Sequence, residues 1–206
     1  MTDGATSGAT PSDGTEGLRR KDLTTREALN AAETDAISLA YNKYIFRGRR
    51  QKSRTAWLTD SFLRTVHVDM FGEIWDWAGK NRTISLNIGC EPHLIQDQLG
   101  ALCGDFNFWN TQSAMETIEI GARLQHRLTK IHPFRNGNGR HARLMSDIYF
   151  RSAKHEIPQW PQVQLLEHGN VIRERYIAAM RDADKGDYGP LITFIKDCLK
   201  LIRSHS

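Results

Sequence analysis

Residues 132–143 read HPFRNGNGRHAR and combine a histidine, a glycine-rich turn and two arginines. A histidine can move a proton near neutral pH. Glycines that open a helix let backbone N–H groups approach a phosphate, and arginine binds phosphate through a planar fork of donors. The segment therefore predicts a base beside a phosphate-binding turn, an arrangement suited to transfer of a group from a nucleotide.

The residues around this turn predict its local structure. Pro133 cannot continue a preceding helix, so His132 is expected at the mouth of the turn. Phe134 is expected to anchor the turn in the core, because buried aromatic side chains commonly do so. Arg140 and Arg143 lie three residues apart, so they can share one face of the helix that follows.

Helical periodicity extends over most of the remaining chain. We expect helices near residues 25–47, 60–71, 96–109, 114–131, 139–153, 164–181 and 188–202. Residues 82–89 instead alternate polar and apolar side chains and predict a short β-hairpin or extended flap. The expected fold is all-α, a bundle of about six to eight helices with one hairpin.

Composition indicates one globular domain. The chain has 206 residues, of which 39% are hydrophobic and 25% charged, close to the usual balance of a soluble protein. No apolar run reaches the roughly 18–20 residues that cross a membrane, and the first 14 residues do not resemble a secretory signal. The three cysteines lack CxxC spacing, which favours reduced thiols in a cytoplasmic protein.

The formal net charge of +4 raises the possibility of a nucleic-acid partner. Residues 47–54 form the densest basic run. Cations favour helix C-termini, so we interpret this run as a solvated helix end, with a contact patch for a nucleic acid or an acidic partner as the alternative. Since the sequence contains no zinc-finger or RRM motif, nucleic-acid binding is not expected.

The 132–143 segment resembles the motif HxFx(D/E)GNGRxxR of the Fic (filamentation induced by cAMP) family and departs from it only at Asn136. Residues 71–83, which include FGEIWDWAGK, resemble the Fic sequence that enters the target-docking flap. The similarity runs from about residue 23 to 199 and is strongest to a bacterial branch called mobile mystery protein B. It implies an arm over residues 1–22 and a Fic domain over residues 23–206.

The resemblance implies a protein adenylyltransferase that moves AMP from ATP to a Tyr, Thr or Ser hydroxyl, including auto-modification. His132 would be the catalytic base, a group titrating near pH 7. The groups implied to bind the phosphates are Gly137, Asn138, Gly139, Arg140 and Arg143. The implied partners are ATP and a protein target, without a membrane, and the oligomeric state is left open.

Asn136 stands where the family usually has a metal-binding Asp or Glu. A neutral amide weakens the attraction to Mg²⁺, which can keep its phosphate and water ligands. The resemblance thus implies Mg²⁺ held mainly through ATP, with Asn136 as a weak ligand.

Two further segments receive roles from the resemblance. The target-docking flap would contain Arg82, Thr83, Ile84, Ser85 and Leu86 and would align a target strand by strand addition. Ser12, Glu16 and Gly17 match the family's inhibitory motif (S/T)xxxE(G/N), of the class II kind. A short helix over residues 12–20 would then place Glu16 against Arg143 and leave ATP misaligned.

Other functions remain open from the sequence. The same fold could remove AMP or transfer another phosphate-containing group. A catalytically weak module that binds a nucleotide or a partner, with Asn136 as the lesion, belongs to a different class. Neither the target, the preferred nucleotide nor a separate antitoxin can be read from the residues.

Overall fold

The computed structural model describes residues 15–203 except 49, 52–55 and 113. In this part of the chain it contains eight α-helices and no β-sheet, which confirms the all-α prediction. The helices are α1 (Arg26–Tyr41), α2 (Asp60–Phe71), α3 (Ile95–Gln112), α4 (Thr117–Ile131), α5 (Asn138–Ser152), α6 (Gln162–Leu166), α7 (Val171–Asp184) and α8 (Gly189–Arg203). A π-helical turn, η1 (Asn42–Arg47), extends α1, and a 3₁₀ turn, η2 (Pro92–Leu94), precedes α3.

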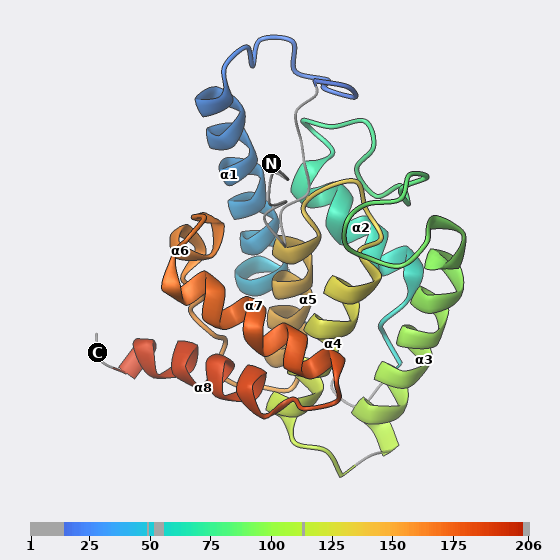
Figure 1. Cartoon of the computed structure of the whole chain (residues 1–206), viewed down its shortest axis with the longest axis vertical. Coiled ribbons are helices and arrows are strands. Elements are labelled where there is room, and N and C mark those ends of the chain that lie inside the picture. The colour runs from blue at the N-terminus through green and yellow to red at the C-terminus, as the bar shows by residue number, and fades with distance from the viewer. Residues whose placement is uncertain (1–14, 49, 52–55, 113, 204–206) are drawn as a thin grey trace, which may run out of the picture.

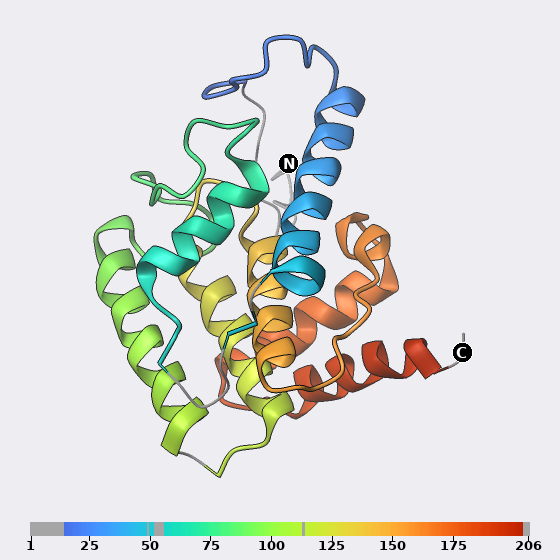
Figure 2. The same ribbon diagram turned by 180° about the vertical axis from the view of Figure 1, so that it is seen from behind.

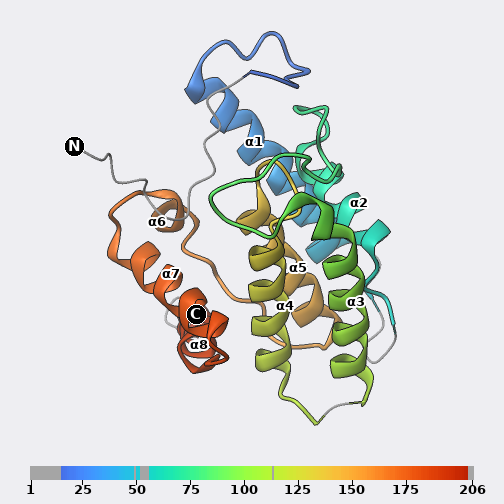
Figure 3. The same ribbon diagram turned by 45° about the vertical axis from the view of Figure 1, so that its right-hand side comes forward.

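Helix α5 lies at the centre of the bundle (Figure 1). Most of its residues are buried, on all sides of the helix, as expected for a helix that other helices surround. Helix α4 packs along it, and α3 lies beside α4 (Figure 3). Helices α1 and α2 cover the opposite side (Figure 2), while α7 and α8 cross the bundle near the lower end of α4 in Figure 1. The turn between α4 and α5 is residues 132–137.

The contact between α4 and α5 depends on a glycine. A Cβ atom on Gly121 of α4 would lie 2.4 Å from Cζ of Phe150 on α5. Phe150 is fully buried, so its ring cannot swing into solvent to make room. Gly121 therefore sets how closely the two central helices approach each other.

The predicted β-hairpin is wrong. Residues 82–91 form an irregular loop, and the pairing that the described residues show is limited to two isolated bridges, Leu18 with Trp75 and Asn81 with Phe134. The physical reason is Arg82, whose side chain donates to the carbonyls of Ile84 and Cys90. These carbonyls turn toward one guanidinium, and not toward a partner strand.

The single helix predicted over residues 164–181 is two helices. Gly169 adopts a positive φ of 76°, a conformation that favours glycine and ends helices. Asn170 then caps α7, because its side-chain oxygen accepts from the N–H of Ile172 at 2.9 Å. Both signals are local and visible in the sequence. On either side of the break, Gln162 of α6 and Tyr176 of α7 both bond to Arg143 in the N-terminal half of α5.

Across the described residues, no helix combines the length and apolar character that a bilayer crossing requires.

The packing at Gly121 gives a stability prediction. Gly121→Ala should lower the free energy of unfolding by about 1–3 kcal/mol, because the added methyl overpacks the α4–α5 contact. Gly100→Ala is the matched control: a Cβ at Gly100 of α3 meets nothing within 4 Å, so the higher helix propensity of alanine should add about 1 kcal/mol. Urea denaturation of both variants measures the difference. Shifts of the same sign and size would contradict the packing argument.

Candidate active site

The turn between α4 and α5 is closed by the side chain of Asn138. Its Oδ1 accepts from the N–H of Phe134 at 2.9 Å, and its Nδ2 donates to the carbonyl of Phe134 at 2.8 Å. Gly137, with φ of 76°, caps α5 and has no room for a Cβ, which would lie 2.5 Å from the ring of Phe71. The turn therefore has a fixed conformation, which sets the position of the N-terminus of α5. Both polar atoms of the Asn138 side chain take part in this closure. Only the backbone of Asn138 therefore remains available to bind a phosphate.

A buried histidine that the sequence analysis overlooked anchors the same turn. The ring of His67 on α2 stacks on Phe134 with a centroid distance of 3.8 Å. His67 Nδ1 accepts from the N–H of Gly79, which leaves Nε2–H to donate to the carbonyl of Asn136 at 3.1 Å. Burial lowers the pKa of His67 well below its ordinary value. His67 is therefore a neutral support of the turn.

His132 ends α4 in the left-handed conformation, with φ of 53°. Its imidazole is buried, and Nδ1 lies 3.2 Å from the carbonyl oxygen of Thr129. A carbonyl only accepts, so Nδ1 carries the proton and Nε2 carries the lone pair. Burial, reinforced by the charge of Arg82, lowers the pKa of His132 to about 4, below the value near 7 that the sequence suggested. The imidazole is thus neutral at pH 7 and able to accept a proton.

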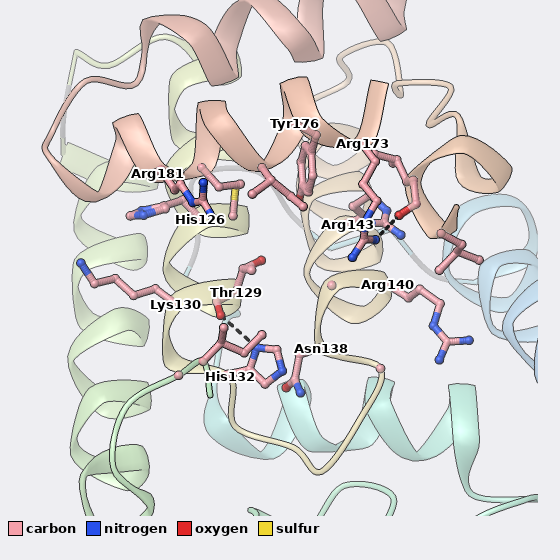
Figure 4. Close-up of a pocket in the computed structure, with 18 of the residues that line it drawn as sticks. His126, Thr129, Lys130, His132, Asn138, Arg140, Arg143, Arg173, Tyr176 and Arg181 are labelled. Atoms are coloured by element: carbon pink, nitrogen blue, oxygen red, sulfur yellow. Dashed lines mark hydrogen bonds between the residues drawn. The ribbon is translucent and has the colours of Figure 1, made fainter. Parts of the chain in front are cut away.

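A cavity of about 740 Å³ opens above this turn. It is lined by His132, residues 136–140, Arg143, the loop residues 87–89 and one face of α7. Figure 4 shows His132 and Asn138 on its floor, with Tyr176 of α7 opposite. The first N–H groups of a helix lack partners within it, and the helix dipole adds positive potential there. The start of α5 is therefore suited to bind an anion in this cavity.

Arg143 is a buried cation in the cavity wall. Its Nη2 donates to Oε1 of Gln162 at 2.9 Å, and the guanidinium also bonds to Tyr176. Nε has no hydrogen-bond partner, and Arg143 forms no ion pair with a carboxylate among the described residues. Although burial lowers its pKa, a guanidinium stays charged. The buried Asp147 carboxyl acts on it electrostatically but does not form an ion pair with it. A buried charge without an ion-pair partner is costly, so this site favours an anionic ligand.

Arg140 differs from Arg143 because a carboxylate holds it. Its Nη1 lies 2.7 Å from Oε2 of Glu33 on α1, and the guanidinium lies over the ring of Phe71. Glu33 is buried and also accepts from the indole N–H of Trp75 at 2.8 Å. In Figure 4 the Arg140 side chain accordingly points toward α1 and away from His132. The two arginines expected to act together therefore have different environments.

The donor set for a metal is sparse. Among the described residues, no group of three or more His, Cys, Asp and Glu side chains could hold an ion. The one candidate at the turn, Oδ1 of Asn136, accepts from the N–H of Gly137 at 2.6 Å. A Mg²⁺ ion prefers several oxygen ligands. The described side chains at this site therefore do not themselves form a metal cage.

The residues predicted to form the flap divide into two groups. Arg82 points inward and is buried beneath the loop, whereas Thr83, Ile84 and Ser85 are exposed. Ser85 donates to Glu91 at 2.8 Å, which restrains the exposed part. Only the residues after Arg82 are accessible to a partner.

The N-terminal arm takes a path that differs from the predicted one. Residues 15–20 form a turn and not a helix, and Glu16 pairs with Arg135 at 2.5 Å and not with Arg143. The helix fails because Gly17 has a positive φ of 82° and lies against Asp76, where a Cβ would meet Oδ1 at 2.4 Å. Ser12, the first residue of the proposed inhibitory motif, lies outside the described residues.

Several contributors to the site were missed because they are distant in sequence. They are Glu33, His67, Gln162 and Tyr176. Gln162 and Tyr176 carry no motif. Glu33 and His67 do leave weak signals in the sequence: a glutamate within the amphipathic helix 26–41 and a histidine among apolar neighbours at 66–71.

Residues 57–150 match the family model described as Fic/DOC family. Among curated relatives, the "Probable protein adenylyltransferase y4lH" of Sinorhizobium fredii is 26% identical over 141 residues, which cover 65% of this chain and 69% of that protein. "Protein adenylyltransferase fic-1" of Caenorhabditis briggsae is 32% identical over 123 residues, 57% of this chain. The chain spans only 22% of the length of the latter protein.

Solved structures share the fold. The BepC protein of Bartonella tribocorum, solved with bound AMPPNP, superimposes with a TM-score of 0.64 at 16% identity, covering 91% of this chain and 98% of that one. Fic-1 of C. elegans gives a TM-score of 0.64 at 21% identity, covering 87% and 51% of the two chains. The motif, the helical fold around it and the family model agree: residues 57–150 match the Fic/DOC family model, and the rest of the chain lies outside that match.

Proposed function

We propose that this protein is an adenylyltransferase, which moves AMP from ATP to a Tyr, Thr or Ser hydroxyl of a protein target. The observation that carries the proposal is the shared cavity of His132 and Arg143. One supplies a neutral imidazole and the other a buried cation without a carboxylate partner among the described residues. The names of the relatives, protein adenylyltransferases, support the same activity.

The proposed step is a displacement at the α-phosphorus of ATP. The target hydroxyl oxygen forms a bond to phosphorus, the bond from phosphorus to the oxygen bridging to the β-phosphate breaks, and pyrophosphate leaves. The hydroxyl proton passes to Nε2 of His132, the nitrogen left with a lone pair by the Nδ1 bond to Thr129. The backbone N–H groups of Asn138 and Gly139 and the Arg143 guanidinium stabilise the phosphate charge, a contribution that usually dominates such transfers. The N–H of Gly137 instead donates to Asn136.

The low pKa of His132 is compatible with this task once ATP is present. An anion near a histidine favours the charged imidazolium and raises its pKa. A bound polyphosphate would therefore bring His132 from about 4 toward the working pH. Magnesium, when bound with ATP, neutralises phosphate charge, and Asn136 can offer it at most a neutral oxygen.

Target docking and self-inhibition belong to the same proposal. Residues Thr83–Leu86, of which the first three are exposed and Leu86 is half-buried, would align a target segment beside the cavity. The arm would restrain the site through the Glu16–Arg135 ion pair, because Arg135 belongs to the turn between α4 and α5. Backbone bonds of Gly17 and Arg19 to residues 74–76 hold the arm at this place. A cytoplasmic location, expected from the cysteines, is part of this proposal.

Loss of the proposed base should abolish transfer. With ATP labelled at the α-phosphate, the protein should acquire label, and His132→Ala should reduce its rate by about 10²–10⁴-fold, the usual contribution of a general base. His93→Ala, which changes an exposed histidine outside the cavity, should label normally. Label from γ-labelled ATP instead would identify transfer of a phosphoryl group. Release of AMP from a modified protein would identify the reverse activity, and no label in any variant would favour a binding module.

The imidazole of His132 should titrate at an unusually low pH. NMR of the free protein should give a midpoint of about 4, and bound ATP should raise it. Because the unfolded chain keeps a pKa near 6.5, the contribution of His132 to folding stability is complete above about pH 6.5 and is lost as the pH falls toward 4. A midpoint near 6.5 in the free protein would contradict the burial argument.

The arm should slow auto-modification. Glu16→Gly should increase labelling with ATP and Mg²⁺ by about two- to fivefold, the range available from one exposed ion pair. Asp22→Asn is the matched control, since it breaks the Arg20–Asp22 pair on the same arm without touching the motif. Equal labelling of wild type and Glu16→Gly would contradict the proposed self-inhibition and would leave the transferase proposal intact.

A further inference from the structure

Arg82 is a buried cation that the catalytic scheme above does not use. Its exposed fraction is 4%, and desolvation lowers its pKa. No described carboxylate forms an ion pair with it. A guanidinium buried in this way must direct its donors at other acceptors.

These acceptors are three backbone carbonyls from two segments of the chain. Arg82 Nε donates to the carbonyl of His132 at 2.7 Å, Nη1 donates to that of Ile84 at 2.8 Å, and Nη2 donates to that of Cys90. The backbone N–H of Arg82 also donates to the carbonyl of Pro133 at 2.9 Å. One side chain therefore joins both ends of the loop 84–90 to the residue that carries the proposed base.

The carbonyl of His132 depends on this contact. His132 has the left-handed conformation, which is uncommon for a residue with a side chain. Such a backbone persists only where its surroundings hold it. Arg82 supplies a charge-assisted bond to this buried carbonyl, and losing a partner of that kind leaves an unsatisfied acceptor.

The loop also rests directly on the base. A Cβ atom on Gly89 would lie 2.6 Å from Cβ of His132 and 2.7 Å from Nη2 of Arg82. Gly89 lines the cavity with Asn87 and Ile88. The N–H of Cys90 donates to the carbonyl of Ile131 at 3.3 Å. Loop, guanidinium and imidazole thus form one packed unit at the cavity mouth.

We propose that Arg82 is a positioning residue that fixes the loop 83–90 and His132 relative to each other, and that it is not a contact for the target strand. This inference rests on the proposed transfer reaction. In that reaction the packed unit of loop, guanidinium and imidazole would align the target hydroxyl with Nε2 of His132. It assigns Arg82 to the transfer step and leaves phosphate binding to α5 and Arg143. Lysine cannot replace it, since one ammonium lacks the planar fork that reaches separated acceptors.

The kinetic test compares Arg82→Lys with Arg64→Lys. Arg64 also joins a helix to a loop carbonyl, that of Gly79 at 3.2 Å, but lies outside the cavity. At saturating ATP, Arg82→Lys should transfer AMP to the target about 100-fold more slowly, the cost of a small misplacement of reacting groups, with an unchanged Kd for ATP. Arg64→Lys should match wild type in both. A loss confined to the Kd for ATP, or wild-type transfer by Arg82→Lys, would overturn the proposal.

A second measurement does not require any transferase activity. Amide hydrogen exchange of residues 83–90 should accelerate in Arg82→Lys, while exchange in the buried helix α5 stays at the wild-type rate. Gly89→Ala provides an independent variant that keeps the guanidinium: its methyl should push the loop away from both His132 and Arg82, with the same acceleration. Unchanged loop exchange in both folded variants would refute the positioning role. If wild type transfers no label but loop exchange responds as expected, the transferase proposal fails and the coupling stands.

Discussion

The two hydrogen bonds between the Asn138 side chain and the backbone of Phe134 hold the arrangement on which the rest of the site depends. They close the turn after α4, so His132 and the first N–H groups of α5 face the same cavity. Phe134 adds burial and the stack on His67. An amide is well suited to this closure because it both donates and accepts. A charged side chain at position 138 could form only one of the two hydrogen bonds, because a carboxylate only accepts and an ammonium only donates.

The electrostatics of the cavity follow from burial. The histidines next to the turn have lowered pKa values because desolvation disfavours the imidazolium. The arginines keep their charge under the same conditions, because no physiological pH deprotonates a guanidinium. The cavity thus combines the neutral base His132 with permanent cations. The proposed polyphosphate substrate would find both charge compensation and a nearby proton acceptor in this cavity.

The local parts of this structure could be predicted from the sequence, and the long-range parts could not. The turn at 132–143 and most helices follow from motif, periodicity and caps, each encoded within a few residues. The hairpin prediction failed because alternation at 82–89 also fits a loop whose carbonyls converge on Arg82. The partner of Arg140 could not be predicted, since no local pattern says that Glu33 on α1 lies beside it. The roles of the predicted site residues stay predictions.

The ion pair between Glu33 and Arg140 also bears on where this protein can be divided. The family match covers residues 57–150, whereas the counterion of Arg140 lies at position 33 and the hydrogen-bond partners of Arg143 lie at 162 and 176. A fragment cut at the limits of the match would contain both guanidinium groups and none of these partners. The smallest fragment that keeps the electrostatics of the cavity must therefore include the counterion of Arg140 and the hydrogen-bond partners of Arg143. It reaches from α1 to α7, well beyond the recognisable sequence.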